Sequence, residues 1–311
     1  GVREHRGIAE RMYCSFPEIF STSDGRLCRI RARSTLVPRC MLSMAAANER
    51  LKELNPAIDI TREASKRYLD YMFCMTEANK NKKEIKQRIA ELREREIDPS
   101  RFVRALVTDP SLVGNRKEQL RFMNDLYCVA SVMQDVDYLD CSFYDLFTFD
   151  ELCRFWECDN YTYYVEKGPD PRNRGRGTAL AETLLDDIVS RAGEDMAAGE
   201  PSVRLRFGHD GCIMALLTLM RIDGWTTPVT DPAKIKDVWQ VHRIPMASNM
   251  QFVFYRNKKN PDDVLVRVLL NEKELRLPLP GDRAPYYRWE DFRDFYAGIV
   301  REARLKLEAT K

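Results

Sequence analysis

The chain is 311 residues long and 44% hydrophobic, so it can bury a sizeable core in one large domain or two. Its 50 Lys and Arg residues are nearly balanced by 48 Asp and Glu residues, and a net charge of +2 gives no indication of a nucleic-acid-binding or membrane-surface protein. No run of about 18 apolar residues occurs, so no transmembrane helix is predicted.

The first predicted elements are a helix over residues 2–13 and a strand over residues 26–34. In the strand, apolar residues alternate with arginines, which is the period of a β-strand. Five arginines crowd this part of the chain: Arg26, Arg29, Arg31, Arg33 and Arg39. A charged strand face is usually solvated, so only Arg39 is a primary candidate for a functional role, and Arg33 is a secondary one.

Residues 59–164 are predicted to be helical throughout. Residues 80–96 are heavily charged, with Glu84 and Arg88 four positions apart, and this pattern indicates a solvated helix face. Residues 138–164 are dense in aromatic side chains, which more often form a core than a ligand-binding surface. We interpret the whole span as a helical domain that is inserted over a sheet.

The remaining elements return to a mixed pattern. A loop rich in Gly, Pro and Arg covers residues 168–177, and a helix is predicted over 179–196. Strands over 251–256 and 264–270 are predicted to form a hairpin, because a polar turn joins them. An amphipathic helix over 289–307 ends the pattern.

The cysteines and acidic residues give no sign of a metal site. The chain has nine cysteines, an odd number, so they cannot all pair with one another. None forms a Cys-x-x-Cys motif, and zinc-ligand spacing is absent, so neither a metal nor another cofactor is expected. Most of the cysteines lie in apolar helical patterns and are predicted to be buried free thiols, with one or two disulfides left open.

The most informative segment is a turn between a buried strand and a core helix. The strand is predicted over 203–207 and the helix over 212–220, with Gly208, His209, Asp210 and Gly211 between them. Such a junction is where α/β sheets bind ligands, and the free N–H groups of a helix N-terminus favour an anion. A histidine and a carboxylic acid beside an anion indicate phosphate chemistry. The alternative is that Asp210 only caps the helix and His209 only packs in the turn.

This turn resembles the His-Asp motif of the histidine acid phosphatases, in the branch that contains phytases and multiple inositol polyphosphate phosphatases. Residues 34–46 resemble the second conserved arginine segment of that family, and weaker similarity runs from the first residue to about residue 280. Arg39 matches the arginine that holds the substrate phosphate, and a guanidinium can donate two parallel hydrogen bonds to phosphate oxygens. The alternative is a surface arginine near a helix start, although a cation is disfavoured there without an anion nearby.

The resemblance implies an α/β fold with a phosphoglycerate-mutase-like sheet flanked by helices and a large inserted all-helical cap. Residues 1–58 and 165–311 are then the α/β phosphatase-like domain, and residues 59–164 are the cap. The family also implies a periplasmic or secreted protein.

The implied activity is hydrolysis of a phosphomonoester, with phytate or a related inositol polyphosphate as the small phosphorylated substrate and without a metal. Arg39 and His209 would bind the phosphate, and Asp210 would protonate the leaving alkoxide. Three further arginines are candidates for substrate contacts: Arg33, Arg172 and Arg174. The alternative for the last two is a mobile, solvated linker.

The family's nucleophile is a histidine in an Arg-His-Gly-x-Arg motif, and none of the three histidines of this chain lies in one. His5 lies in a different context, and His242 has no supporting pattern. Either the chain is an N-terminally truncated phosphatase that forms a phosphohistidine on a histidine outside it, or it is a non-catalytic relative that binds a phosphorylated ligand. A third interpretation is a helical interaction module over residues 59–164.

The nucleophile's strand lies in the middle of the family's sheet. Without it, the neighbouring strands would leave backbone N–H and C=O groups unpaired. We therefore predict that Arg39 and His209 flank a gap at the position of that strand.

Overall fold

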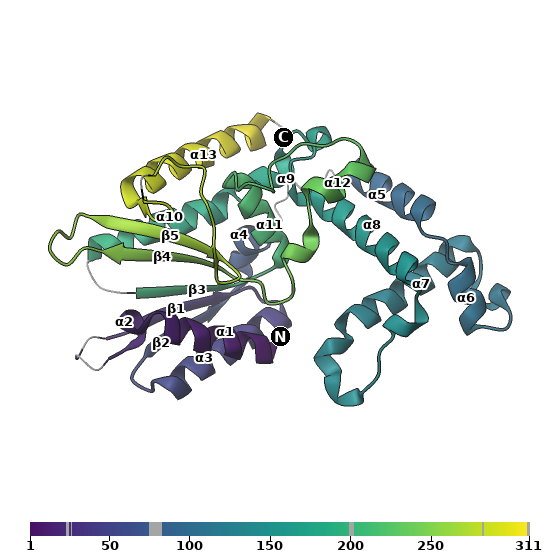
Figure 1. Cartoon of the computed structure of the whole chain (residues 1–311), viewed down its shortest axis with the longest axis horizontal. Coiled ribbons are helices and arrows are strands. Elements are labelled where there is room, and N and C mark those ends of the chain that lie inside the picture. Colours follow the sequence, from purple (N-terminus) through teal and green to yellow (C-terminus); the bar gives the residue numbers. More distant parts are fainter. Residues whose placement is uncertain (23–24, 26, 75–82, 199–201, 282, 310–311) are drawn as a thin grey trace.

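A computed structural model describes residues 1–22, 25, 27–74, 83–198, 202–281 and 283–309 of the chain. In Figure 1 the strands and their covering helices form one half of the molecule, and a group of helices from the middle of the chain forms the other half. The helices are α1 (Val2–Ser15), α2 (Pro17–Phe20), α3 (Pro38–Leu54), α4 (Leu69–Met72), α5 (Lys83–Glu96), α6 (Ser100–Leu106), α7 (Arg116–Val132), α8 (Phe149–Lys167), α9 (Arg176–Ala179), α10 (Glu182–Ala198), α11 (Asp210–Leu219), α12 (Pro232–Val238) and α13 (Trp289–Ala309).

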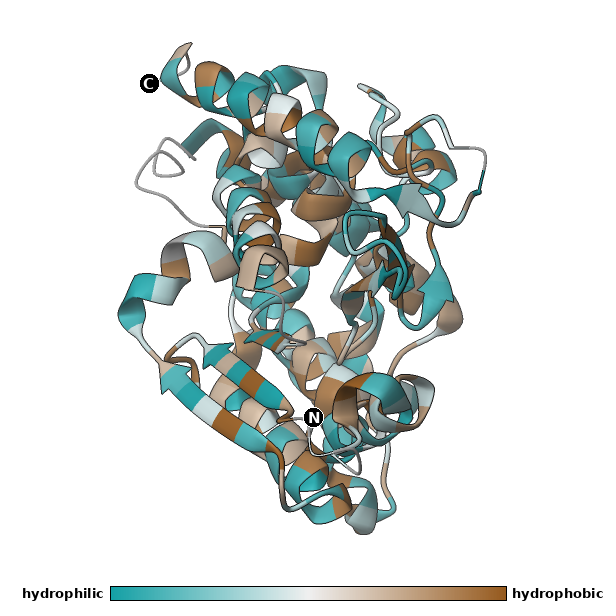
Figure 2. Ribbon diagram, turned by 90° about the vertical axis from the view of Figure 1, so that its left-hand side faces the viewer, coloured by the Kyte–Doolittle hydropathy of each residue, from teal (hydrophilic) through white to brown (hydrophobic). Residues whose placement is uncertain are grey.

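Three parallel strands form the first sheet, in the order β2-β1-β3. They are β1 (Arg29–Ser34), β2 (Asp59–Ala64) and β3 (Ser202–Phe207), and their last residues stand opposite one another. Hydrophilic and hydrophobic residues alternate along β1 and β3, and stripes of both kinds are visible on the sheet in Figure 2. Because all three strands end at the same edge, the segments that follow β1 and β3 meet there.

The prediction that residues 59–164 are helical throughout is wrong at its start, because residues 59–64 form β2. This strand pairs with β1 along its whole length, and four of its six residues are exposed. It is an edge strand with few apolar residues, so its own sequence carries a weak signal and its partner decides its conformation. The described residues that follow are helices and short 3-10 turns, as predicted, and the division into the domains 1–58, 59–164 and 165–311 stays a prediction.

Antiparallel strands form the second sheet, as the predicted hairpin required. The hairpin is β4 (Met250–Arg256) and β5 (Val264–Leu270), and two short strands, β6 (Lys273–Glu274) and β7 (Tyr287–Arg288), pair with β5. Helices α10 and α13 pack against each other beside this sheet in the larger of the two hydrophobic clusters.

The two sheets are separate in the described part of the chain. One edge of β3 pairs with β1 and one edge of β4 pairs with β5, and no described strand pairs with the opposite edge of either. Side chains bridge the division, because Ile30 and Leu51 on one side share a hydrophobic cluster with Val253 and Leu269 on the other. The break in backbone pairing therefore falls between β3 and β4.

All nine cysteines lie within the described residues, and none of them forms a disulfide. Five of them are buried, as predicted for most of the cysteines, and the other four are partly or fully exposed. No helix in the described ranges has the length and apolar character needed to cross a lipid bilayer.

Candidate functional site

The candidate site begins where β1 and β3 end. Thr35 follows β1 and donates its backbone N–H to the carbonyl of Phe207, the last residue of β3, at 3.3 Å. Gly208 comes next, and a Cβ at this position would lie 2.6 Å from the carbonyl oxygen of Met72. Only glycine therefore lets the chain near α4 pass this close to the turn.

Arg39 and His209 meet directly at this edge. Arg39 is the second residue of α3, and its Nη2 lies 3.2 Å from Nδ1 of His209, the residue that caps α11. A guanidinium can only donate, so Nδ1 accepts and the ring proton belongs on Nε2, which faces Oγ1 of Thr35 at 3.3 Å. The predicted gap between Arg39 and His209 is absent because β1 and β3 are neighbours; the division of the sheet lies one strand further on.

The surroundings of His209 keep its ring neutral. The side chain is 9% exposed, and the ring of Phe73 packs edge-on against it with a centroid distance of 4.1 Å. Burial, followed by the positive charge of Arg39, lowers the pKa of His209 to about 4, although Asp210 acts in the opposite direction. At neutral pH the imidazole is therefore an uncharged hydrogen-bonding group.

Asp210 is exposed and is held from two sides. Its Oδ1 accepts the backbone N–H of Gly211 at 2.9 Å, and its Oδ2 accepts the hydroxyl of Tyr163, on α8, at 2.8 Å. Burial and the negative charge of Asp210 raise the pKa of Tyr163, so its hydroxyl remains a donor. His209, rather than Asp210, occupies the N-cap position of α11, and a functional role for either residue stays a prediction.

Arg33 lies in an ion-pair network rather than beside His209. Its guanidinium approaches Glu63 at 3.5 Å and Asp187 at 3.8 Å, and it lies over the ring of Tyr68. Among the described residues, no contact joins Arg33 to Arg39 or His209.

The two loop arginines are also apart from the turn. Arg172 Nε donates to the fully buried carboxylate of Asp170 at 3.0 Å. Arg174 follows the short 3-10 turn Pro171–Asn173 and has a φ of 56°. In the described part of the chain, neither side chain contacts the residues of the candidate site.

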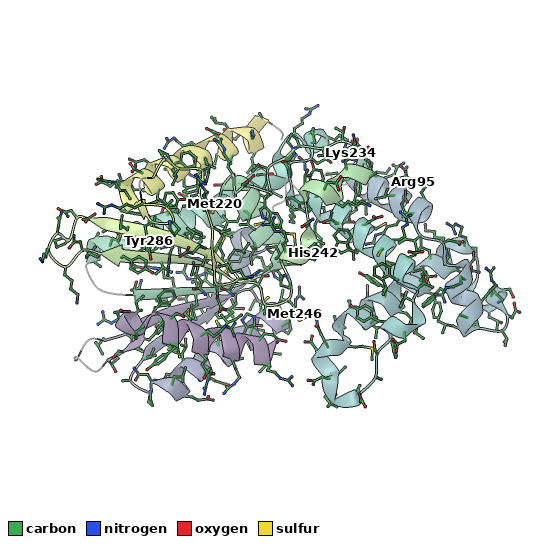
Figure 3. All side chains as sticks on the ribbon, in the orientation of Figure 1. Arg95, Met220, Lys234, His242, Met246 and Tyr286 are labelled. Carbon is green, nitrogen blue, oxygen red and sulfur yellow. The ribbon has the colours of Figure 1, made fainter. Side chains whose placement is uncertain are left out.

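The other two histidines take no part in the Arg39–His209 contact. His5 packs edge-on against Phe207, with ring centroids 5.7 Å apart, and burial lowers its pKa. His242, labelled in Figure 3, lies against Trp156 of α8 with ring centroids 5.6 Å apart. Both contacts are packing contacts.

Four residues near the turn were not predicted from the sequence as residues of the site: Thr35, Phe73, Tyr163 and Lys167. Tyr163 and Lys167 are four positions apart in an aromatic helix that we interpreted as core, and this spacing puts both on one face of α8. Among residues 1–22, 25, 27–74, 83–198, 202–281 and 283–309, no group of three or more His, Cys, Asp or Glu side chains could hold a metal ion.

Comparison with models of known protein families gives a match. The model of the histidine phosphatase superfamily (branch 2) matches residues 44–271. The chain belongs to this family. The matched segment contains His209 and Asp210, whereas Arg39 lies just before it. A comparison with curated proteins finds no match.

Solved structures agree with the family's fold. The multiple inositol polyphosphate phosphatase of Bifidobacterium longum in complex with inositol hexasulfate is 18% identical, with a TM-score of 0.71 over 93% of this chain and 77% of that one. Its complex with phosphate has a TM-score of 0.67 at 17% identity, over 96% of this chain and 79% of that one. The phytase from D. castellii is 15% identical, with a TM-score of 0.65; the match covers 96% of this chain and 64% of the phytase. The predicted family and the predicted fold class are therefore confirmed.

Proposed function

We propose that the chain is the binding and acid–base part of a phosphomonoester hydrolase that acts on inositol polyphosphates. The observation that carries the proposal is the 3.2 Å contact between Arg39 and His209 at the ends of β1 and β3, with Asp210 as the next residue. This arrangement collects a guanidinium, an imidazole and a carboxyl group at a helix N-terminus, which suits a phosphate. The B. longum structures with inositol hexasulfate and with phosphate support the choice of ligand class.

Each residue of the site has its own role in the proposed reaction. Arg39 binds the non-bridging oxygens and offsets their growing charge, and His209 donates its single ring N–H, on Nε2, to the same phosphate in place of Thr35. A nucleophilic histidine attacks phosphorus while the ester P–O bond breaks, and Asp210 gives its proton to the leaving alkoxide. Asp210 then takes a proton from the water that attacks the phosphohistidine, which releases phosphate and restores the histidine.

We further propose that this nucleophile comes from outside the 311 residues. None of the three histidines lies in an Arg-His-Gly-x-Arg motif, and His209 already serves the phosphate. Among the described residues, β3 and β4 each have one edge without a partner strand, which is in keeping with a further strand between them. The same absence of the motif favours a second candidate function, in which the chain binds a phosphorylated ligand without hydrolysing it.

Calorimetry with inositol hexasulfate tests the binding site, and phosphate release from phytate separates the two functions. We expect saturable binding, with at least about a tenfold loss for Arg39→Ala, because a charge-assisted hydrogen bond contributes about 1.5–3 kcal/mol. Arg50→Ala, on the same helix but paired with Glu10 and Glu53, is the matched control and should bind like the wild type.

Absence of heat at millimolar ligand would refute both functions, and unchanged binding by Arg39→Ala would refute the site. Where phytate is hydrolysed, Asp210→Asn should lower turnover at least about 100-fold, the usual effect of removing a general acid. Binding without phosphate release would leave the non-catalytic function.

A further inference from the structure

Lys167, the last residue of α8, is a buried cation that the proposed reaction does not use. Its side chain is only 6% exposed, and its Nζ donates one long hydrogen bond, 3.4 Å, to the carbonyl of Cys74. Within the described residues no carboxylate pairs with it. An ammonium has three N–H donors, so most of its hydrogen-bonding capacity is unused. A buried charge in this state is unfavourable unless something else compensates it.

The position of Lys167 points to the compensating group. Its Cε would lie 3.1 Å from a Cβ at Gly211, so the side chain runs along the first turn of α11. One helical turn earlier on α8, Tyr163 donates to Asp210. Two residues before Gly211 in the same turn, His209 contacts Arg39. Two positive side chains, on α3 and α8, thus lie around one helix N-terminus, which itself favours an anion.

The charge of Lys167 acts on the site. Burial and Arg39 are the main causes of the lowered pKa of His209, and Lys167 lowers that pKa further. The ammonium and the imidazole therefore lie within electrostatic reach of each other. A phosphate on Arg39 and His209 would lie in the same field and would be attracted to Lys167.

We propose that Lys167, which no carboxylate of the described residues neutralises, is a second anion-binding residue of this site and that a phosphate group of the substrate neutralises its charge. The inference rests on the proposed function, because it uses the same anion site. An anion-binding role and a structural role for Lys167 differ in one measurable respect. A lysine that stabilises the fold lowers stability when it is removed, whereas a lysine that awaits an anion does not.

The test compares Lys167→Met with the wild type in two measurements. Methionine keeps the length of the side chain and removes the charge. We expect affinity for inositol hexasulfate to fall about 10-fold or more, in line with the loss of one charge-assisted hydrogen bond. We expect the melting temperature without ligand to stay the same or rise. Lys52→Met is the control, because it removes the same charge at the far end of α3. Like Lys167, Lys52 donates to a backbone carbonyl, that of Ile58 at 2.8 Å.

Lys167→Gln, which keeps a donor but no charge, repeats the test in case the methionine variant does not fold. Weaker binding with an undiminished melting temperature, in either variant, supports the proposal. Wild-type affinity in both variants overturns it while the proposed function stands, provided that Arg39→Ala still loses binding. Weaker binding that comes with a lowered melting temperature in both variants also overturns it. Absence of binding by the wild type would overturn the proposed function and this inference together.

Discussion

The protein environment of His209 strongly changes the pKa of its ring from that of a histidine in water. Its pKa falls from 6.5 to about 4 because the ring is buried and Arg39 lies beside it. In the unfolded chain the ring binds a proton at pH values below 6.5, whereas in the folded chain it stays neutral down to about pH 4. The contribution of this group to stability is therefore complete above pH 6.5 and is lost as the pH falls towards 4.

Arg39→Ala should raise the pKa of His209, because it removes the largest charge effect and leaves burial and the weaker effect of Lys167 to lower the pKa. The free energy of unfolding of the variant should then depend less on pH between 6.5 and 4, by about 1.4 kcal/mol for each pKa unit regained. The chain has only three histidines, so their ring signals can be titrated individually by NMR.

Arg50→Ala is the control for this titration and should leave the pKa of His209 unchanged. A His209 signal that titrates near pH 6.5 in the wild type would contradict the burial and the Arg39 contact together.

The sequence identifies some residues of the site better than others, for a physical reason. His209 and Asp210 are recognisable because a buried strand, a Gly-flanked turn and a core helix follow one another directly in the chain. Arg39 is recognisable from its place after the preceding strand. Phe73 and Lys167 come from segments that only the tertiary fold brings to the turn, and no local pattern marks them.

At the level of elements, the turn between β3 and α11 depends on close packing against the chain near α4. A Cβ at Gly208 would meet the Met72 carbonyl oxygen at 2.6 Å and the Met72 Cβ at 3.3 Å. For a Cβ at Gly211, the nearest atoms would belong to the flexible side chain of Lys167, the first at 3.1 Å. The two glycines of one turn therefore serve different purposes, since the first makes room for backbone and the second for a side chain.

Gly208→Ala should destabilise the protein by about 1–3 kcal/mol, the usual cost of overpacking against groups that cannot move freely. Gly211→Ala should cost less, because the lysine can shift and alanine favours the helix by about 1 kcal/mol. Urea unfolding of both variants measures the difference. Equal losses would show that Met72 does not lie against Gly208 as described.

The strand β2 is an element that the local sequence pattern does not predict. Periodicity located the hairpin of β4 and β5 because alternating apolar residues fill its pattern. In β2 only Ile60 is a large apolar side chain, and the charged residues around it match a solvated helix equally well. Its conformation follows from pairing with β1, which is a long-range interaction that the local pattern does not contain.

At the scale of the whole molecule, the break between the two sheets is the main departure from a continuous core. Val203 and Leu205 of β3 pack against the cluster that contains Val253 and Leu269, so the two sheets touch through side chains. Their backbones do not pair across the division, and β3 and β4 each have an edge without a described partner. Unpaired edges of this kind are sites where another strand can add.

Hydrogen exchange tests this division directly. β1 is paired on both sides, by β2 and β3, so its amides should exchange slowly. In β3, the amides that point away from β1 should exchange at least about 10-fold faster than those that point towards it, because no ladder hydrogen bond must open first. β5 has a partner on both sides and serves as the slow reference in the other sheet. Slow exchange along both edges of β3 would mean that a further strand covers it, and the two sheets would then be one.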